Sequence, residues 1–247
     1  MCVRHIIVFQ RELFMDAKAI ISGEFLGQFS SAFGNTEQAK KALGLVWEKV
    51  SQKKGQEEPY FRHNIGVGLA VMKMGMEKET VIAALLHNAL RLGVSKKDIE
   101  SGFGKNVLEL IEQQERLEKA LEFKEGGIDA VKKKIMILVS TNPTAVIMQL
   151  GETIDKLRNI RNVPEEERAE FIEEVKGIYD PLAQKLGIYE IGAEMNDLMF
   201  RHESLETYGR IESEINAVIG RQKEGIEATK AALKSALEAA SITASVS

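Results

Sequence analysis

The chain has 247 residues, 44% of them hydrophobic and 28% charged, and a formal net charge of −4 at pH 7. This composition suits a globular protein with a sizeable core, while the acidic balance argues against nucleic acid as a direct partner. The single cysteine, Cys2, excludes a disulfide framework and a cysteine-rich zinc site. Because no segment has the pattern of a signal peptide or a membrane span, we expect a cytoplasmic protein.

In chain order, a polar loop at 51–58 precedes two helices, and the second contains the apolar run VIAALLHNALRLGV at 81–94. Ser95 and Asp98 then form a capping-box pattern, which predicts a short helix that ends near Gly102. The segment KEGG at 124–127 is too short for a domain linker. The first 200 residues are therefore expected to form one domain.

Prolines mark the starts of the later helices. Asn-Pro at 142–143 and Asp-Pro at 180–181 each have the pattern of an N-cap followed by the first helical residue. Pro164 precedes three glutamates, which the helix dipole favours in a first turn. From residue 208 to 240 the apolar spacing predicts one long helix.

No convincing run of alternating polarity occurs before residue 241, so the pattern predicts an all-α bundle of about ten helices. We expect one domain over residues 1–205. Residues 206–247 are expected to form a helical connector.

Two histidines, His63 and His87, lie 24 positions apart (87 − 63) within these helical segments. A lone histidine on an apolar helix is more often a hydrogen-bonded core residue than a ligand. Here the flanks carry further information: EPYFRHNIGVGLAVMKMGMEKETVIAALLHNAL at 58–90 and IYDPLAQKLGI at 178–188. These segments resemble the N-terminal HD hydrolase domain of the RelA/SpoT family, which makes and degrades the alarmone (p)ppGpp. The resemblance spans about residues 52–221.

The resemblance implies a centre for one divalent metal, usually manganese, held by two histidines and two aspartates. His63 and His87 are retained, whereas Asn88 and Glu152 stand where the family has the aspartates. Since an amide oxygen is a poor ligand for a metal that also competes with water, we expect these four to be vestigial positions without a metal.

Further departures affect the residues that would activate water. Arg91 and Leu92 stand where the family has an acidic Glu-Asp pair, and Lys156 stands where it has an asparagine. Arginine cannot accept a proton at physiological pH, so the acid–base role is lost. Of the family's basic nucleotide-binding loop, Lys54 alone keeps its charge.

These departures favour a catalytically inactive HD domain of a RelA-type GTP pyrophosphokinase, which regulates a synthetase domain in alarmone metabolism and the stringent response. The expected partners are that synthetase domain, for which we find no segment in this chain, and a guanine nucleotide. No membrane partner and no cofactor are expected. Two alternatives stay open: a (p)ppGpp pyrophosphohydrolase with a rearranged site that uses Mn²⁺, and a helical module that forms homodimers.

One structural prediction concerns Arg91. If Arg91 lies on the same helix face as His87, its guanidinium can reach Glu152 and balance that carboxylate in place of the metal.

Overall fold

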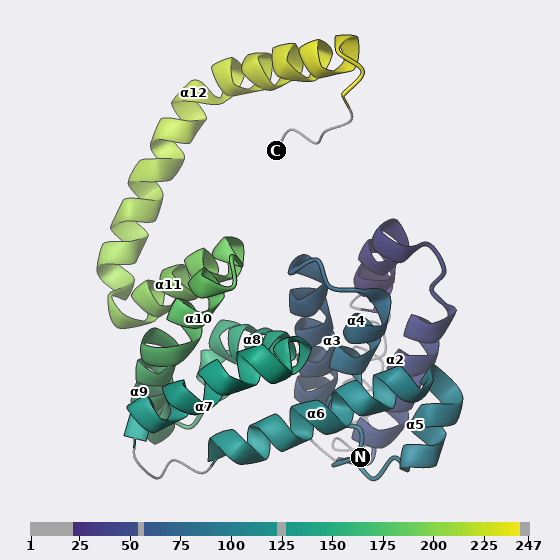
Figure 1. The fold of residues 1–247 in the computed structure, drawn as a ribbon. Coiled ribbons are helices and arrows are strands. Elements are labelled where there is room, and N and C mark those ends of the chain that lie inside the picture. Colours follow the sequence, from purple (N-terminus) through teal and green to yellow (C-terminus); the bar gives the residue numbers. More distant parts are fainter. Residues whose placement is uncertain (1–21, 54–56, 123–126, 243–247) are drawn as a thin grey trace, which may run out of the picture. The chain divides into compact units, whose positions relative to one another are not determined.

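The computed structural model describes residues 22–53, 57–122 and 127–242 (Figure 1). Within these ranges all regular secondary structure is helical, which confirms the all-α prediction. The chain divides into two compact units between Asn196 and Asp197. The predicted boundary between residues 205 and 206 stays a prediction. In the described ranges, no helix combines the length and the apolar character that a membrane span requires.

The first unit starts with helical residues 22–33. It continues with α2 (Glu37–Val50), α3 (Glu57–Lys73), α4 (Lys78–Leu85), α5 (Lys96–Phe103), α6 (Lys105–Glu122), α7 (Gly127–Thr141), α8 (Pro143–Arg158), the 3-10 turn η1 (Ile160–Asn162), α9 (Glu165–Glu174), the π-helical turn η2 (Val175–Tyr179) and α10 (Asp180–Lys185). Two further helices follow, α11 (Tyr189–Glu203), which crosses the division, and α12 (Leu205–Ala239).

Several helix starts follow the capping signals in the sequence. The Ser95 hydroxyl accepts the backbone N–H of Asp98 at 3.1 Å, which confirms the predicted cap of α5. Helix α8 begins at Pro143, and α9 begins directly after Pro164. The long helix predicted near the end of the chain is confirmed as α12.

Helix α10 does begin at Asp180, but Asp180 is not the N-cap that the sequence predicts, because its own backbone is already helical. Helical backbone continues from α9 through the π turn η2 into α10, so Asp180 lies inside a continuous helical segment. Pro181 cannot donate a hydrogen bond to the carbonyl four residues earlier. We attribute the wider π turn just before it to this interruption, which the helix absorbs without ending.

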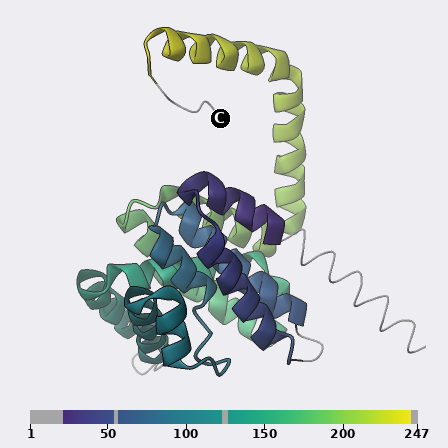
Figure 2. The ribbon, with the colours of Figure 1, turned by 90° about the vertical axis from the view of Figure 1, so that its right-hand side faces the viewer.

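The helices that matter for the site pack around α3 (Figure 1 and Figure 2). Helix α3 packs on α4 and α8, and α6 packs on the same two helices. Small residues allow the close approach: a Cβ on Gly66 would collide with the Asp155 carboxylate, and one on Gly151 would lie 2.7 Å from Val71 Cγ2. The polar side chains of α3, α6 and α8 are thereby brought together beside the turn that follows α4.

Candidate metal centre

Three side chains that could hold a metal ion converge between these helices. His63 comes from α3, Glu152 from α8, and His87 from the turns at 86–93 that follow α4. One ligand atom from each lies within 4.8 Å of the other two. The structure therefore brings together three of the four positions expected from the sequence.

The sequence predicts that His87 lies within a helix, but α4 ends two residues earlier, at Leu85. The last carbonyls of a helix lack partners within it, and here side chains supply them. His87 Nδ1 contacts the Ala84 carbonyl at 2.8 Å, and Asn64 Nδ2 donates to the Leu85 carbonyl at 2.7 Å. The turns end at Gly93, whose φ of 83° suits glycine.

The contact with Ala84 settles the tautomer of His87. A carbonyl oxygen only accepts hydrogen bonds, so Nδ1 carries the proton and Nε2 keeps its lone pair. That Nε2 is buried and has no hydrogen-bond partner among the described residues. Burial also lowers the pKa of His87 to about 4, which keeps the ring neutral at pH 7. A buried neutral imidazole with a free lone pair is suited to bind a metal.

His63 is oriented in a similar way by an acid that the sequence analysis missed. Its Nδ1 lies 2.7 Å from Oδ2 of Asp155, which is buried on α8 against Gly66. This contact leaves Nε2 of His63 available as a ligand, as in many carboxylate–histidine–metal sites. The spacing held a signal, because Asp155 follows Glu152 by three positions and so shares its helix face.

These residues fit a divalent metal. Two imidazole nitrogens and one carboxylate form a donor set that several divalent ions accept. Two ligands of one ion lie up to about 4.2 Å apart when each bond is about 2.1 Å long. The separations of up to 4.8 Å would therefore close with small side-chain movements.

Asn88, the fourth expected position, is engaged elsewhere. Its Oδ1 accepts a hydrogen bond from Asn64 Nδ2 at 2.9 Å, and its Nδ2 donates to Asn64 Oδ1 at 3.3 Å. Both side chains are buried, with Asn64 0% and Asn88 6% exposed. This reciprocal amide pair ties α3 to the turns after α4, and it occupies the oxygen that a metal would need.

The predicted ion pair between Arg91 and Glu152 is wrong. The Arg91 guanidinium instead contacts Glu118 of α6, with Nη1 3.0 Å from Oε2. The turns after α4 break the helical register on which the prediction depended, so Arg91 is directed toward α6. Its neighbour Leu92 packs against the hydrophobic core.

Glu118 brings a second carboxyl group to the centre, again unforeseen from the sequence. It forms a hydrogen bond with Glu152, and Gln114 Nε2 donates to Glu118 Oε1 at 3.4 Å. Burial and the charge of Glu152 raise the pKa of Glu118 to about 8, so Glu118 is largely protonated at neutral pH. Burial opposes ionisation of Glu152, but the histidines and the hydrogen bond from Glu118 lower its pKa.

The two expected lysines lie outside this cluster. Lys156 Nζ lies 4.4 Å from the ring centroid of Phe171, which is a cation–π contact between α8 and α9. Lys54 lies outside the described residues.

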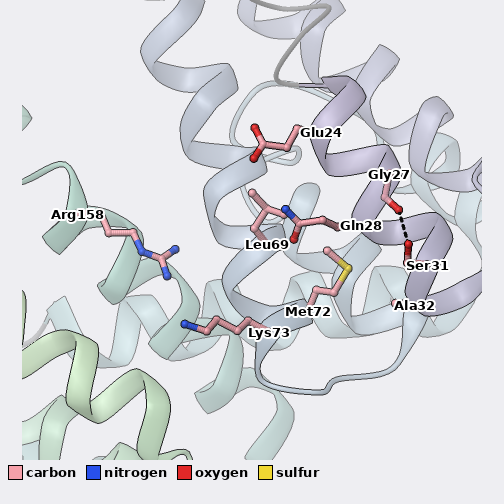
Figure 3. Close-up of a pocket in the computed structure, with 9 residues that line it drawn as sticks. All are labelled: Glu24, Gly27, Gln28, Ser31, Ala32, Leu69, Met72, Lys73 and Arg158. Atoms are coloured by element: carbon pink, nitrogen blue, oxygen red, sulfur yellow. Dashed lines mark hydrogen bonds between the residues drawn. The ribbon is translucent and has the colours of Figure 1, made fainter. Parts of the chain in front are cut away.

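A separate groove lies at the other end of α3 (Figure 3). Lys73 and Arg158 point into the same space there, beside Met72. Both cations are paired with Glu194, Arg158 through two nitrogens at 2.6 and 2.9 Å and Lys73 at 3.3 Å. Their charges are thus balanced, and the groove offers less for an anionic ligand than the histidine centre does.

Comparison with known proteins places this centre in context. The HD-domain family pattern matches residues 42–189. The bifunctional (p)ppGpp synthase/hydrolase SpoT of Escherichia coli is 30% identical over 200 residues, which cover 79% of this chain and 28% of SpoT. A guanosine-3′,5′-bis(diphosphate) 3′-pyrophosphohydrolase of Aquifex aeolicus is 29% identical over 72% of this chain and 25% of its own length. GTP pyrophosphokinase rsh of Brucella ovis is 23% identical over 79% of this chain and 26% of its own length.

The chain thus spans about a quarter of the length of these relatives. A solved structure of a metazoan ortholog of SpoT that hydrolyzes ppGpp is also similar, with a TM-score of 0.48, 21% identity, and coverage of 69% of this chain and 98% of that one. The chain belongs to the HD-domain family, and it is similar within that family to the SpoT and Rsh proteins.

Proposed function

We propose that this chain is an HD domain of guanosine-3′,5′-bis(diphosphate) metabolism that binds the nucleotide and a divalent metal without hydrolysing the nucleotide. Three relatives support the nucleotide class, because their names include a hydrolase, a bifunctional synthase/hydrolase and a pyrophosphokinase for this compound or its precursor. In a longer protein, such a domain would regulate an attached synthetase domain.

One observation carries the proposed lack of hydrolysis. The turn after His87, where the resemblance expects an acid pair, presents Arg91 and Leu92. The guanidinium cannot take a proton from water, and Leu92 packs into the core. Glu118 does not stand in for the missing base, because its carboxyl group is already engaged by Arg91 at 3.0 Å and by Glu152.

Metal binding is proposed from the donor geometry. His63, His87 and Glu152 would hold the ion, which would supply Lewis-acid stabilisation of phosphate oxygens. Asp155 and the Ala84 carbonyl orient the two rings, and burial keeps His87 neutral. This geometry favours a three-ligand metal site over the metal-free centre expected from the sequence.

A titration tests this function. Isothermal titration calorimetry of the metal-free chain with Mn²⁺ should give close to one site, and His63→Ala should remove it. The nucleotide should then bind to the Mn²⁺-loaded chain without being consumed. Failure of the wild-type chain to bind the nucleotide with Mn²⁺ would refute the proposal.

A second function, metal-dependent pyrophosphohydrolysis, is favoured by one observation. His63, His87 and Glu152 together offer three ligand atoms for one metal ion. Glu118 adds a further carboxyl group beside Glu152. This function predicts sustained pyrophosphate release with Mn²⁺, and loss of that release when His63 and His87 are both replaced by alanine.

A further inference from the structure

We propose that Arg91 is a phosphate-binding residue, whose guanidinium takes the pyrophosphate group of the nucleotide beside the metal donors while Glu118 holds it in place. This inference rests on the proposed function, and it names the side chain that would recognise the diphosphate.

The first support is the way in which Arg91 is held. Its Nη1 lies 3.0 Å from Oε2 of Glu118, whose side chain is only 12% exposed, whereas that of Arg91 is 49% exposed. A guanidinium has five N–H donors in a rigid fork, and the contact with Glu118 uses one nitrogen. The remaining donors can therefore bind an anion that enters from solvent.

The second support is that the anchor itself is fixed. Glu118 is hydrogen-bonded to Glu152, and Gln114 donates to it at 3.4 Å. Gln114, which is 1% exposed, also donates to Gln149 at 2.9 Å and so links α6 to α8. A cation held by such a network loses little conformational freedom when a ligand binds.

The third support is the charge around the donor cluster. A divalent ion would be balanced by the carboxylates of Glu152 and of Asp155 behind His63, so Arg91 would supply the remaining positive charge beside the donors. Arg91 is close enough to act electrostatically on both His87 and Glu152. Arginine binds phosphate oxygens in a bidentate manner, so the ion and the guanidinium together suit a diphosphate.

Binding of inorganic pyrophosphate and of guanosine-3′,5′-bis(diphosphate) to the Mn²⁺-loaded chain, measured by calorimetry, tests this role. Arg91→Ala should weaken both by about tenfold or more, the loss typical of a charge-assisted hydrogen bond. The affinity of the Arg91→Ala variant for Mn²⁺ should equal or exceed that of the wild-type chain, because the substitution removes a positive charge near the metal donors. Arg116→Ala is the matched control, since Arg116 is 67% exposed and pairs with Glu112; it should leave both affinities unchanged.

Two further variants keep the test decisive if Arg91→Ala folds poorly. Arg91→Lys keeps the charge but loses the fork, so it should weaken pyrophosphate binding by about threefold or more. Glu118→Ala removes the anchor altogether and should have a smaller effect in the same direction. If the wild-type chain binds both ligands and the Arg91 variants bind them equally well, the role of Arg91 is refuted while the proposed function stands. If the wild-type chain binds no nucleotide, the proposed function fails with it.

Discussion

The buried amide pair between Asn64 and Asn88 gives a stability prediction whose size follows from its contacts. Asn64→Ala removes the donor to the Leu85 carbonyl at 2.7 Å and both contacts with Asn88. Each buried polar group left without a partner costs ~1–3 kcal/mol. With two such groups, the carbonyl and the Asn88 amide, the free energy of unfolding should fall by ~2–6 kcal/mol.

A double-mutant cycle measured by urea unfolding isolates the pair. Asn88→Ala should cost less, ~1–3 kcal/mol, because Asn64 keeps its bond to Leu85. The double variant should be less destabilised than the sum of the two by ~1–3 kcal/mol. Asn106→Ala, at an exposed position of α6, is the control and should change stability by less than ~0.5 kcal/mol.

Additive effects in this cycle would refute the reasoning. A coupling energy below ~0.5 kcal/mol would mean that the two amides do not pair in solution. The oxygen of Asn88 would then be free to act as a fourth metal ligand.

Three further predictions follow from the same centre. Asp155→Asn should lower Mn²⁺ affinity by ~10–100-fold in calorimetry, because it weakens the orientation of a ligand histidine; unchanged affinity would count against that role. Gly66→Ala, which collides with Asp155, should cost ~1–3 kcal/mol in urea unfolding, whereas Gly44→Ala, with nothing near its Cβ, should stabilise α2 by ~0.5–1 kcal/mol. In the metal-free protein the pKa of His87 is lowered from 6.5 to about 4, so between these pH values the unfolded chain binds a proton that the folded chain does not. The free energy of unfolding should therefore fall by ~3 kcal/mol as the pH drops from 6.5 to 4. The raised pKa of Glu118 gives the opposite slope between pH 4.5 and about 8, so Glu118→Gln should make the rise in stability up to pH 6.5 visible. The same pH profile in the variant and the wild-type chain would contradict the Glu118 shift, and a variant whose stability does not rise up to pH 6.5 would contradict the His87 shift.

The sequence predicted the features that local chemistry determines. Capping by Ser95 and the helix starts at Pro143 and Glu165 depend on a few neighbouring residues, and all three are observed. The convergence of His63, His87 and Glu152 was predicted through the resemblance, because the motif positions fix which helix faces meet.

The rest depends on tertiary contacts that spacing does not encode. The apolar run around His87 predicts a continuing helix, but Asn64 and the His87 ring take the last carbonyls of α4 and the chain turns. That turn directs Arg91 to Glu118 instead of Glu152. Glu118 lies on α6 and has no spacing relation to the motif residues, so only packing brings it to the centre.

The most direct test of the central claim is the rate of pyrophosphate release from guanosine-3′,5′-bis(diphosphate) by the Mn²⁺-loaded wild-type chain. We expect a rate equal to that of the His63→Ala, His87→Ala double variant. Restoring the acid pair with Arg91→Glu and Leu92→Asp should raise it above this background if that pair is what the centre lacks. Turnover by the wild-type chain clearly above the double variant would contradict the account and establish the domain as a hydrolase.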